Sequence, residues 1–122
     1  MRRPPEDPER EQRITYEIVV DAYGPEERAM GWHCYLEEQL HFPFRAKCIK
    51  ARPISPLREG EEVTVTSMAP EDDCPGGMFV IIEWSGRTFG VPLAQLSGIK
   101  VNKETAQAIA DWHYWVARGY EF

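Results

Sequence analysis

The sequence has few of the features that mark thiolate metal sites or membrane spans. Its three cysteines, Cys34, Cys48 and Cys74, are widely spaced and form no Cys-x-x-Cys pair. This spacing supports neither a structural zinc site nor a disulfide framework. No apolar run approaches the length of about 18 residues that a transmembrane helix needs, and the first residues form no apolar signal segment. We therefore expect a soluble, reduced and cytoplasmic protein.

Positive charge is also in short supply. The 14 lysines and arginines face 20 aspartates and glutamates, which gives a formal net charge of −6 over 122 residues. Nucleic acids and anionic lipids bind basic surfaces, because cationic side chains must displace their counterions. The charge therefore argues against both as partners. It is compatible with divalent cations or basic partners, and it identifies no particular protein partner.

Sequence signatures of catalysis are missing as well. The chain contains no nucleophile elbow, no phosphate-binding loop and no local Cys-His signature. We therefore expect that the protein is not an enzyme. It also lacks the EF-hand loop, in which Asp-x-Asp-x-Asp-Gly is followed by a bidentate Glu. A calcium site would have to be assembled from separate segments.

What the sequence does contain is an acidic loop. Residues 70–77 read Pro-Glu-Asp-Asp-Cys-Pro-Gly-Gly, so that Glu71, Asp72 and Asp73 are consecutive. Adjacent carboxylates repel one another, and calcium takes about six to eight oxygen ligands, many of them carboxylate. However, Asp and Pro also favour turns for backbone reasons alone. The residues by themselves leave a cation site and a solvated turn open.

Two further acids stand at the end of a predicted helix. Glu37 and Glu38 occupy its last turn, where negative charge opposes the helix dipole by about 0.3–1 kcal/mol. One explanation is a solvated helix end with Arg45 or Lys47 nearby. The other is that one of the two glutamates supplies oxygens to the acidic loop.

Asp21 and Asp111 complete the candidate ligands. Asp21 lies just before Gly24-Pro25 and is either a cap for the next helix or a ligand. Asp111 lies in the middle of a predicted helix, where helical spacing places it beside Tyr114 and Arg118. Pairing with one of these is the simpler explanation for Asp111, and metal ligation is the alternative.

The three histidines do not indicate a zinc site. The spacings of His33, His41 and His113 repeat no ligand motif. His33 and His113 fall on apolar faces of predicted helices, where a histidine is usually a hydrogen-bonded part of the core. We expect this role for both.

The order of the predicted elements indicates an α+β fold. Residues 1–12 have no apolar residue after Met1 and predict a disordered lead-in, followed by a single domain over 13–122. Residues 13–23 fit a helix and a strand equally well. Apolar spacing predicts a helix from Pro25 to about Gln39 and a last helix that opens at Lys103.

Short strands are predicted between these helices. Their ranges are 44–51, 61–68, 77–84, 87–92 and 98–101, with a tight hairpin at Ser85-Gly86 and a helical turn at residues 92–96. About five short strands in this order predict a small SH3-like β-barrel, flanked by N-terminal helices and one C-terminal helix.

Five segments, in the same order along the chain, resemble the CcbP family of small prokaryotic calcium-binding proteins. They are Val-Asp-Ala-Tyr-Gly-Pro-Glu-Glu-Arg-Ala-Met-Gly-Trp (20–32), Tyr-Leu-Glu-Glu-Gln-Leu-His-Phe-Pro-Phe (35–44), Met-Ala-Pro-Glu-Asp-Asp-Cys (68–74), Val-Pro-Leu-Ala-Gln-Leu (91–96) and Ala-Ile-Ala-Asp-Trp-His-Tyr-Trp (108–115). The resemblance covers about residues 14–120.

This resemblance implies a cytoplasmic, non-EF-hand protein that buffers or sequesters Ca²⁺ through clustered carboxylates. The candidate ligands are Glu71, Asp72, Asp73, Glu38, Glu37, Asp21 and Asp111. A second class of function stays open. An SH3-like interaction module would hold a peptide or a basic partner on aromatic side chains such as Trp84 and Phe89.

Overall fold

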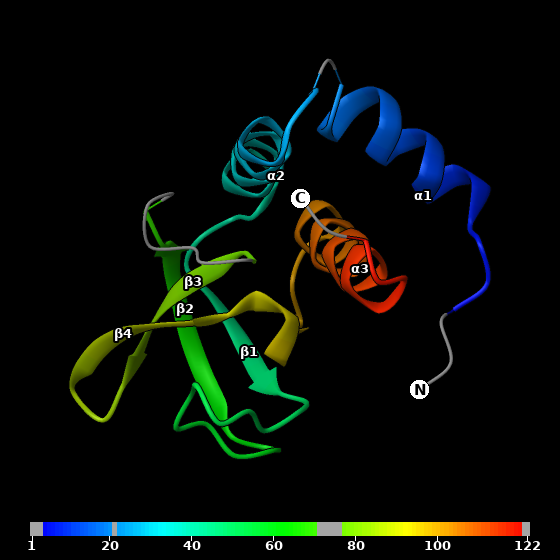
Figure 1. Cartoon of the computed structure of the whole chain (residues 1–122). Coiled ribbons are helices and arrows are strands. Elements are labelled where there is room, and N and C mark those ends of the chain that lie inside the picture. Colours follow the sequence, from blue (N-terminus) through cyan, green and yellow to red (C-terminus); the bar gives the residue numbers. More distant parts are fainter. Residues whose placement is uncertain (1–3, 21, 71–76, 121–122) are drawn as a thin grey trace.

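The computed structural model describes residues 4–20, 22–70 and 77–120 (Figure 1). The helices are α1 (Pro8–Arg13), the π-helix η1 (Ile14–Ile18), α2 (Pro25–Gln39), the 3₁₀ turn η3 (Leu93–Gln95) and α3 (Lys103–Ala117). The strands are β1 (Phe44–Cys48), β2 (Glu62–Met68), β3 (Phe79–Trp84), β4 (Arg87–Pro92) and β5 (Leu96–Ile99). None of the helices within these ranges is long and apolar enough to cross a membrane.

The strands form one antiparallel sheet in the order β4-β3-β2-β1-β5. The α+β class is therefore confirmed, but the predicted SH3-like barrel is not, because the sheet is open. The turn η3 carries the chain away from β4, and β5 then pairs with the outer side of β1, where Ala46 lies opposite Gly98. This places β4 and β5 at opposite edges instead of joining them.

The hairpin between β3 and β4 forms where the sequence predicts it. Ser85 and Gly86 both have positive φ values, 51° and 75°, as the tight turns that match strand twist require. Trp84 consequently lies opposite Arg87. The strand after η3 begins two residues earlier than predicted, at Leu96 instead of residue 98.

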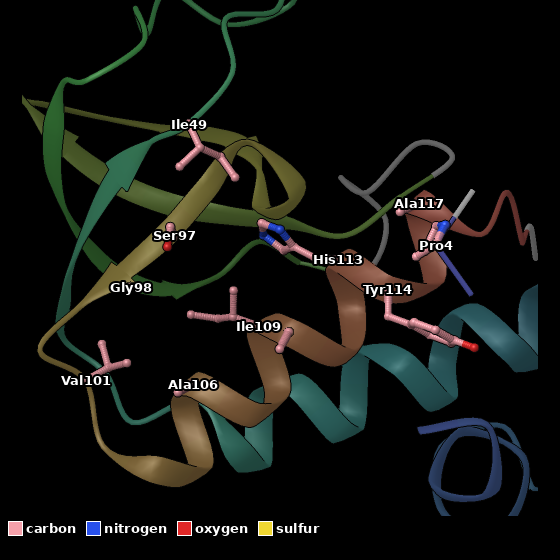
Figure 2. Close-up of a pocket in the computed structure, with 11 residues that line it drawn as sticks. Pro4, Ile49, Ser97, Gly98, Val101, Ala106, Ile109, His113, Tyr114 and Ala117 are labelled. Atoms are coloured by element: carbon pink, nitrogen blue, oxygen red, sulfur yellow. The ribbon is translucent and has the colours of Figure 1, made fainter. Parts of the chain in front are cut away.

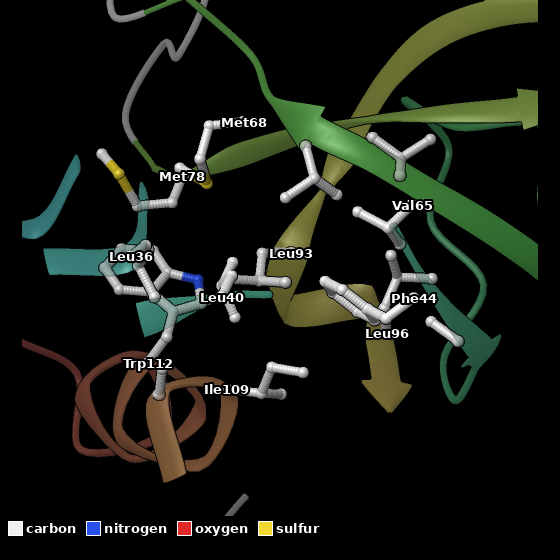
Figure 3. Close-up of a cluster of buried hydrophobic side chains, with 14 of the residues drawn as sticks. Leu36, Leu40, Phe44, Val65, Met68, Met78, Leu93, Leu96, Ile109 and Trp112 are labelled. Atoms are coloured by element: carbon white, nitrogen blue, oxygen red, sulfur yellow. The ribbon is translucent and has the colours of Figure 1, made fainter. Parts of the chain in front are cut away.

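The core lies between the sheet and two helices. Trp32 and Leu36 of α2 and Trp112 of α3 are buried. Leu36 and Trp112 lie on the side of the core that faces the strands (Figure 3). The rings of Trp32 and Trp112 pack edge to face with their centroids 5.0 Å apart. This aromatic contact fixes α2 against α3.

The chain before α2 differs from the expected disordered lead-in. Residues 8–13 form α1, which begins with Pro8 and is capped by Asp7, whose side chain accepts a hydrogen bond from the backbone of Arg10 at 3.2 Å. No residue of α1 is buried, so its sequence lacks the apolar stripe by which helices are predicted. The ambiguous segment continues α1 as η1, with Ile14 and Ile18 buried.

The π-helix crosses α2 at very short range. A Cβ atom on Gly31 would lie 2.3 Å from the backbone oxygen of Ile18, closer than any side chain allows. Only glycine permits this crossing, because the obstructing atom belongs to the backbone and cannot rotate away.

We expect that Gly31→Ala destabilises the protein although alanine is the better helix former. Overpacking of this kind costs about 1–3 kcal/mol, against a gain of about 1 kcal/mol in helix propensity. Thermal melting should therefore show a lower midpoint for Gly31→Ala. Gly90→Ala on β4 is the matched control, because its Cβ would make only ordinary contacts at 3.9 Å. An unchanged or higher midpoint for Gly31→Ala would contradict the close crossing.

Candidate metal centre

The described residues place the two ends of the acidic loop, whereas Glu71, Asp72 and Asp73 lie outside them. The backbone of Ala69 donates a hydrogen bond to Phe79 at 3.0 Å, and Leu93 donates to Met78 at 2.9 Å. Ala69 and Met78 are both buried. The loop therefore leaves and re-enters the protein at fixed points at the end of the β2–β3 pair.

Helix α2 is attached to the start of this loop. The Nε2 atom of His33 lies 2.8 Å from the backbone oxygen of Ala69, and since that oxygen accepts, the ring donates. His33 is partly buried. The structure thus confirms the predicted hydrogen-bonded role of His33, and the bond holds one face of α2 against Ala69, the residue just before the loop.

This contact separates the roles of Glu37 and Glu38. Because an α-helix turns by about 100° per residue, Glu37 lies about 40° around α2 from His33, and Glu38 lies about 140° away. Glu37 is therefore on the side of α2 that carries the contact between His33 and Ala69. Both glutamates are exposed, and neither has a hydrogen bond or ion pair among the described residues.

Arg45, one of the two basic neighbours expected for these glutamates, is engaged elsewhere. Arg45 donates a hydrogen bond to the Thr64 hydroxyl at 2.8 Å and lies 3.5 Å from a carboxylate oxygen of Glu62. Arg45 therefore does not explain the two acids at the end of α2.

Asp111 has a different environment from the other candidates. It is fully buried, and each of its oxygens accepts two hydrogen bonds. Oδ1 accepts from Arg10 at 2.6 Å and from Arg13 at 2.8 Å, while Oδ2 accepts from Arg13 at 2.8 Å and from the Tyr35 hydroxyl at 2.7 Å. Four donors, three from two guanidinium groups and one from a phenol, leave no oxygen of Asp111 for a cation.

The predicted partners of Asp111 were therefore wrong, although pairing with an arginine was the right kind of explanation. Arg118 instead donates to the backbone oxygen of Pro4 at 2.9 Å and pairs with Glu6 at 3.4 Å. The hydroxyl of Tyr114 accepts a hydrogen bond from the backbone of Asp7 at 3.1 Å. Helical spacing finds neighbours on the same helix, whereas the partners of Asp111 come from α1 and α2.

The hydrogen bonds and burial around Asp111 shift the pKa values of Tyr35 and Arg13. Burial raises the pKa of Tyr35 to about 12, with further contributions from the hydrogen bond to Asp111 and from its charge. Hydrogen bonding to Asp111 raises the pKa of the Arg13 guanidinium. At neutral pH the phenol is therefore neutral and Arg13 is charged.

Among residues 4–20, 22–70 and 77–120, no group of three or more His, Cys, Asp or Glu side chains could hold a metal ion.

His113 donates a hydrogen bond to the backbone oxygen of Leu96 at 2.7 Å, and burial lowers its pKa. It lies in an apolar pocket between β5 and α3 (Figure 2). Its predicted hydrogen-bonded role is confirmed. Asp21, like the acidic triplet, lies outside the described residues.

We expect that Asp111→Asn lowers the free energy of unfolding by about 3–5 kcal/mol, as the loss of one partner of a buried ion pair does. Denaturant unfolding measures this loss. The matched control is Glu6→Gln, which removes an exposed ion pair and should cost at most about 1 kcal/mol. A similarly small effect for both variants would contradict the buried network.

Tyr35 should make stability depend on alkaline pH. Its pKa in the folded protein, about 12, lies above its ordinary value of 10.0, so the fold favours the neutral phenol. This contribution is complete below pH 10 and is lost as the pH rises toward 12. The difference in unfolding free energy between the native chain and Tyr35→Phe should therefore shrink over this interval. A difference that stays constant with pH would show that Tyr35 titrates normally.

Comparison with known proteins adds independent information. A family model for calcium binding, Calci_bind_CcbP, matches residues 12–116. The crystal structure of Anabaena CcbP superimposes with a TM-score of 0.88 at 43% sequence identity and covers 100% of both chains. A calcium binding protein in the calcium-binding form superimposes with a TM-score of 0.84 at 43% identity over 95% of both chains.

A search of curated proteins gives no match. The family model nevertheless spans most of the chain, and the similarity to solved structures extends over its full length at a level where fold and family are shared. The chain therefore belongs to the CcbP family of calcium-binding proteins.

Proposed function

We propose that the chain binds calcium at a site centred on Glu71, Asp72 and Asp73, with Glu37 as an additional ligand. The observation that carries this proposal is the 2.8 Å contact between His33 and the backbone oxygen of Ala69. It holds α2 beside the start of the acidic loop. Glu37 is exposed, and no partner among the described residues restrains its carboxylate.

The donors in this site are suited to calcium. Calcium accepts about six to eight oxygens in a flexible geometry, whereas magnesium demands a small octahedron and loses water reluctantly. Carboxylates from a loop and a helix, completed by backbone oxygens and water, fit the first ion better. Soft metals prefer thiolates, and the buried Cys48 instead directs its thiol to the backbone oxygen of Lys50 at 3.4 Å.

We propose that Glu38 and Asp21 take no part in this primary site. Glu38 lies about 140° around α2 from His33, whereas Glu37 lies about 40° away. Glu38 faces η1 and lines a groove there with Glu17. Asp21 follows η1 closely in the sequence, so we assign Glu38 and Asp21 at most to a separate and weaker contact.

We propose further that the protein buffers or sequesters calcium in the cytoplasm and does not catalyse a reaction. The excess of acidic side chains and the relative in a calcium-binding form support this role. The SH3-like peptide module is not favoured. The sheet is open, and Trp84 and Phe89 are partly buried against each other, with ring centroids 5.8 Å apart.

Calcium should stabilise the native chain, and removal of the loop carboxylates should abolish this effect. At a calcium concentration of about one hundred times the dissociation constant, the stabilisation should be about 2.7 kcal/mol per site. We expect that the double variant Asp72→Asn/Asp73→Asn loses it and that Glu37→Gln weakens it. Titration calorimetry and thermal melting, each with calcium and with chelator, measure both effects.

Glu83→Gln is the matched control, because Glu83 is an exposed acid near the opposite end of β3 from the loop. It should bind calcium as the native chain does.

Protons compete with calcium for carboxylates, so the affinity of the native chain for calcium should also fall between about pH 7 and about pH 5. Calcium binding that survives the double variant unchanged would place the site elsewhere, and no binding at millimolar calcium would overturn the proposal.

A further inference from the structure

A second concave surface lies between η1 and α2. It is a groove of about 410 Å³. Its apolar lining includes Ile18, Val20 and Met30, and its acidic lining consists of Glu17, Glu27 and Glu38. We call it the η1–α2 groove.

Two strongly exposed apolar side chains line the groove. Val20 is 51% exposed and Met30 is 52% exposed. They are two of the seven large apolar side chains that are exposed in the described part of the chain. Exposed apolar side chains around a groove are typical of an interaction surface.

The charged side chains that line the groove have one sign. Glu17, Glu27 and Glu38 are all exposed, and no lysine or arginine is among its described lining residues. Glu27 accepts one long hydrogen bond, from the backbone of Tyr23 at 3.3 Å, and forms no ion pair with a residue that the structure describes. An apolar floor inside an acidic rim is complementary to a basic and apolar ligand.

The walls of the groove are held in place before any ligand arrives. Ile18 is buried and lies at the glycine crossing, where its backbone oxygen closes on Gly31. Tyr35 is fixed by its 2.7 Å hydrogen bond to Asp111. Met30, in contrast, is exposed and unbranched, and methionine adapts well to different apolar partners. A rigid groove with one adaptable side chain suits the binding of a helix.

We propose that the η1–α2 groove docks a basic amphipathic helix of another protein. Its apolar side chains would contact Val20 and Met30, and its lysines or arginines would face the three glutamates. The acidic rim repels anionic membranes and nucleic acids. A calcium ion alone would leave the apolar floor unexplained. The inference goes beyond calcium binding and does not depend on it.

The probe for this surface is a synthetic helical peptide of leucine and lysine, labelled with a fluorophore, with its leucines on one face. Fluorescence anisotropy should detect binding of this peptide to the native chain in chelator, where calcium does not occupy Glu38. A scrambled peptide of the same composition has the same charge but no apolar face, and should bind at least about tenfold more weakly. Equal binding of both peptides would reduce the effect to non-specific charge attraction and overturn the proposal.

Variants then locate the peptide. Met30→Asp should weaken binding about tenfold or more, because it removes apolar contact area from the groove. Ile54→Asp is the matched control, since Ile54 is also exposed but lies outside the groove. Met30→Ala, which adds no charge, should weaken binding in the same direction, and melting curves confirm that each variant is folded. Unchanged affinity in both Met30 variants would overturn the assignment.

The salt dependence of peptide binding tests the role of the acidic rim. Glu17→Gln/Glu38→Gln should weaken binding and reduce its dependence on salt, since electrostatic attraction is screened by ions. Unchanged salt dependence would contradict the role of the rim.

Sedimentation of the native chain and of Met30→Asp tests whether a second copy of this chain occupies the groove instead. Self-association that is lost in Met30→Asp would mean that a second copy of this chain fills the groove, and would overturn the proposal.

Discussion

The buried carboxylate of Asp111 is the interaction on which the arrangement of the helices depends. A carboxylate removed from water is unfavourable by several kcal/mol unless its charge is paired and its oxygens accept hydrogen bonds. Arg10, Arg13 and Tyr35 meet this requirement, and they come from α1 and α2. One side chain of α3 therefore holds two other helices, and α1, which has no buried residue, is attached through charge more than through apolar burial.

Both of the proposed binding surfaces include residues of α2. On one side, His33 binds the start of the acidic loop and Glu37 points the same way, which supports calcium binding there. On the other side, η1 is held close by Gly31 and by the Asp111 network, and the groove with Glu38 forms between them. Glu37 and Glu38, adjacent in the sequence, thus point about 100° apart around α2.

Sequence patterns predicted the features of the fold that depend on interactions between residues close together in the chain. The bounds of α2, Pro25–Gln39, and the hairpin at Ser85-Gly86 agree with prediction, since proline at a helix start and positive φ in a turn act over a few residues. The contacts between Asp111 and Arg10 or Arg13 span 101 and 98 residues, and α1 has no apolar stripe, so neither could be predicted locally. The open sheet was not predicted because β5 pairs with β1, a strand that is distant from it in the sequence.

An open sheet leaves two strands with unpaired backbone groups, which in many proteins invite strands of other chains. Here both edges are poor templates for further pairing. Strand β4 contains Gly90 and ends at Pro92, which has no backbone donor, and its Arg87 is exposed. Strand β5 covers only four residues. The fold therefore limits growth into larger sheets through the composition and length of its outermost strands, without closing into a barrel.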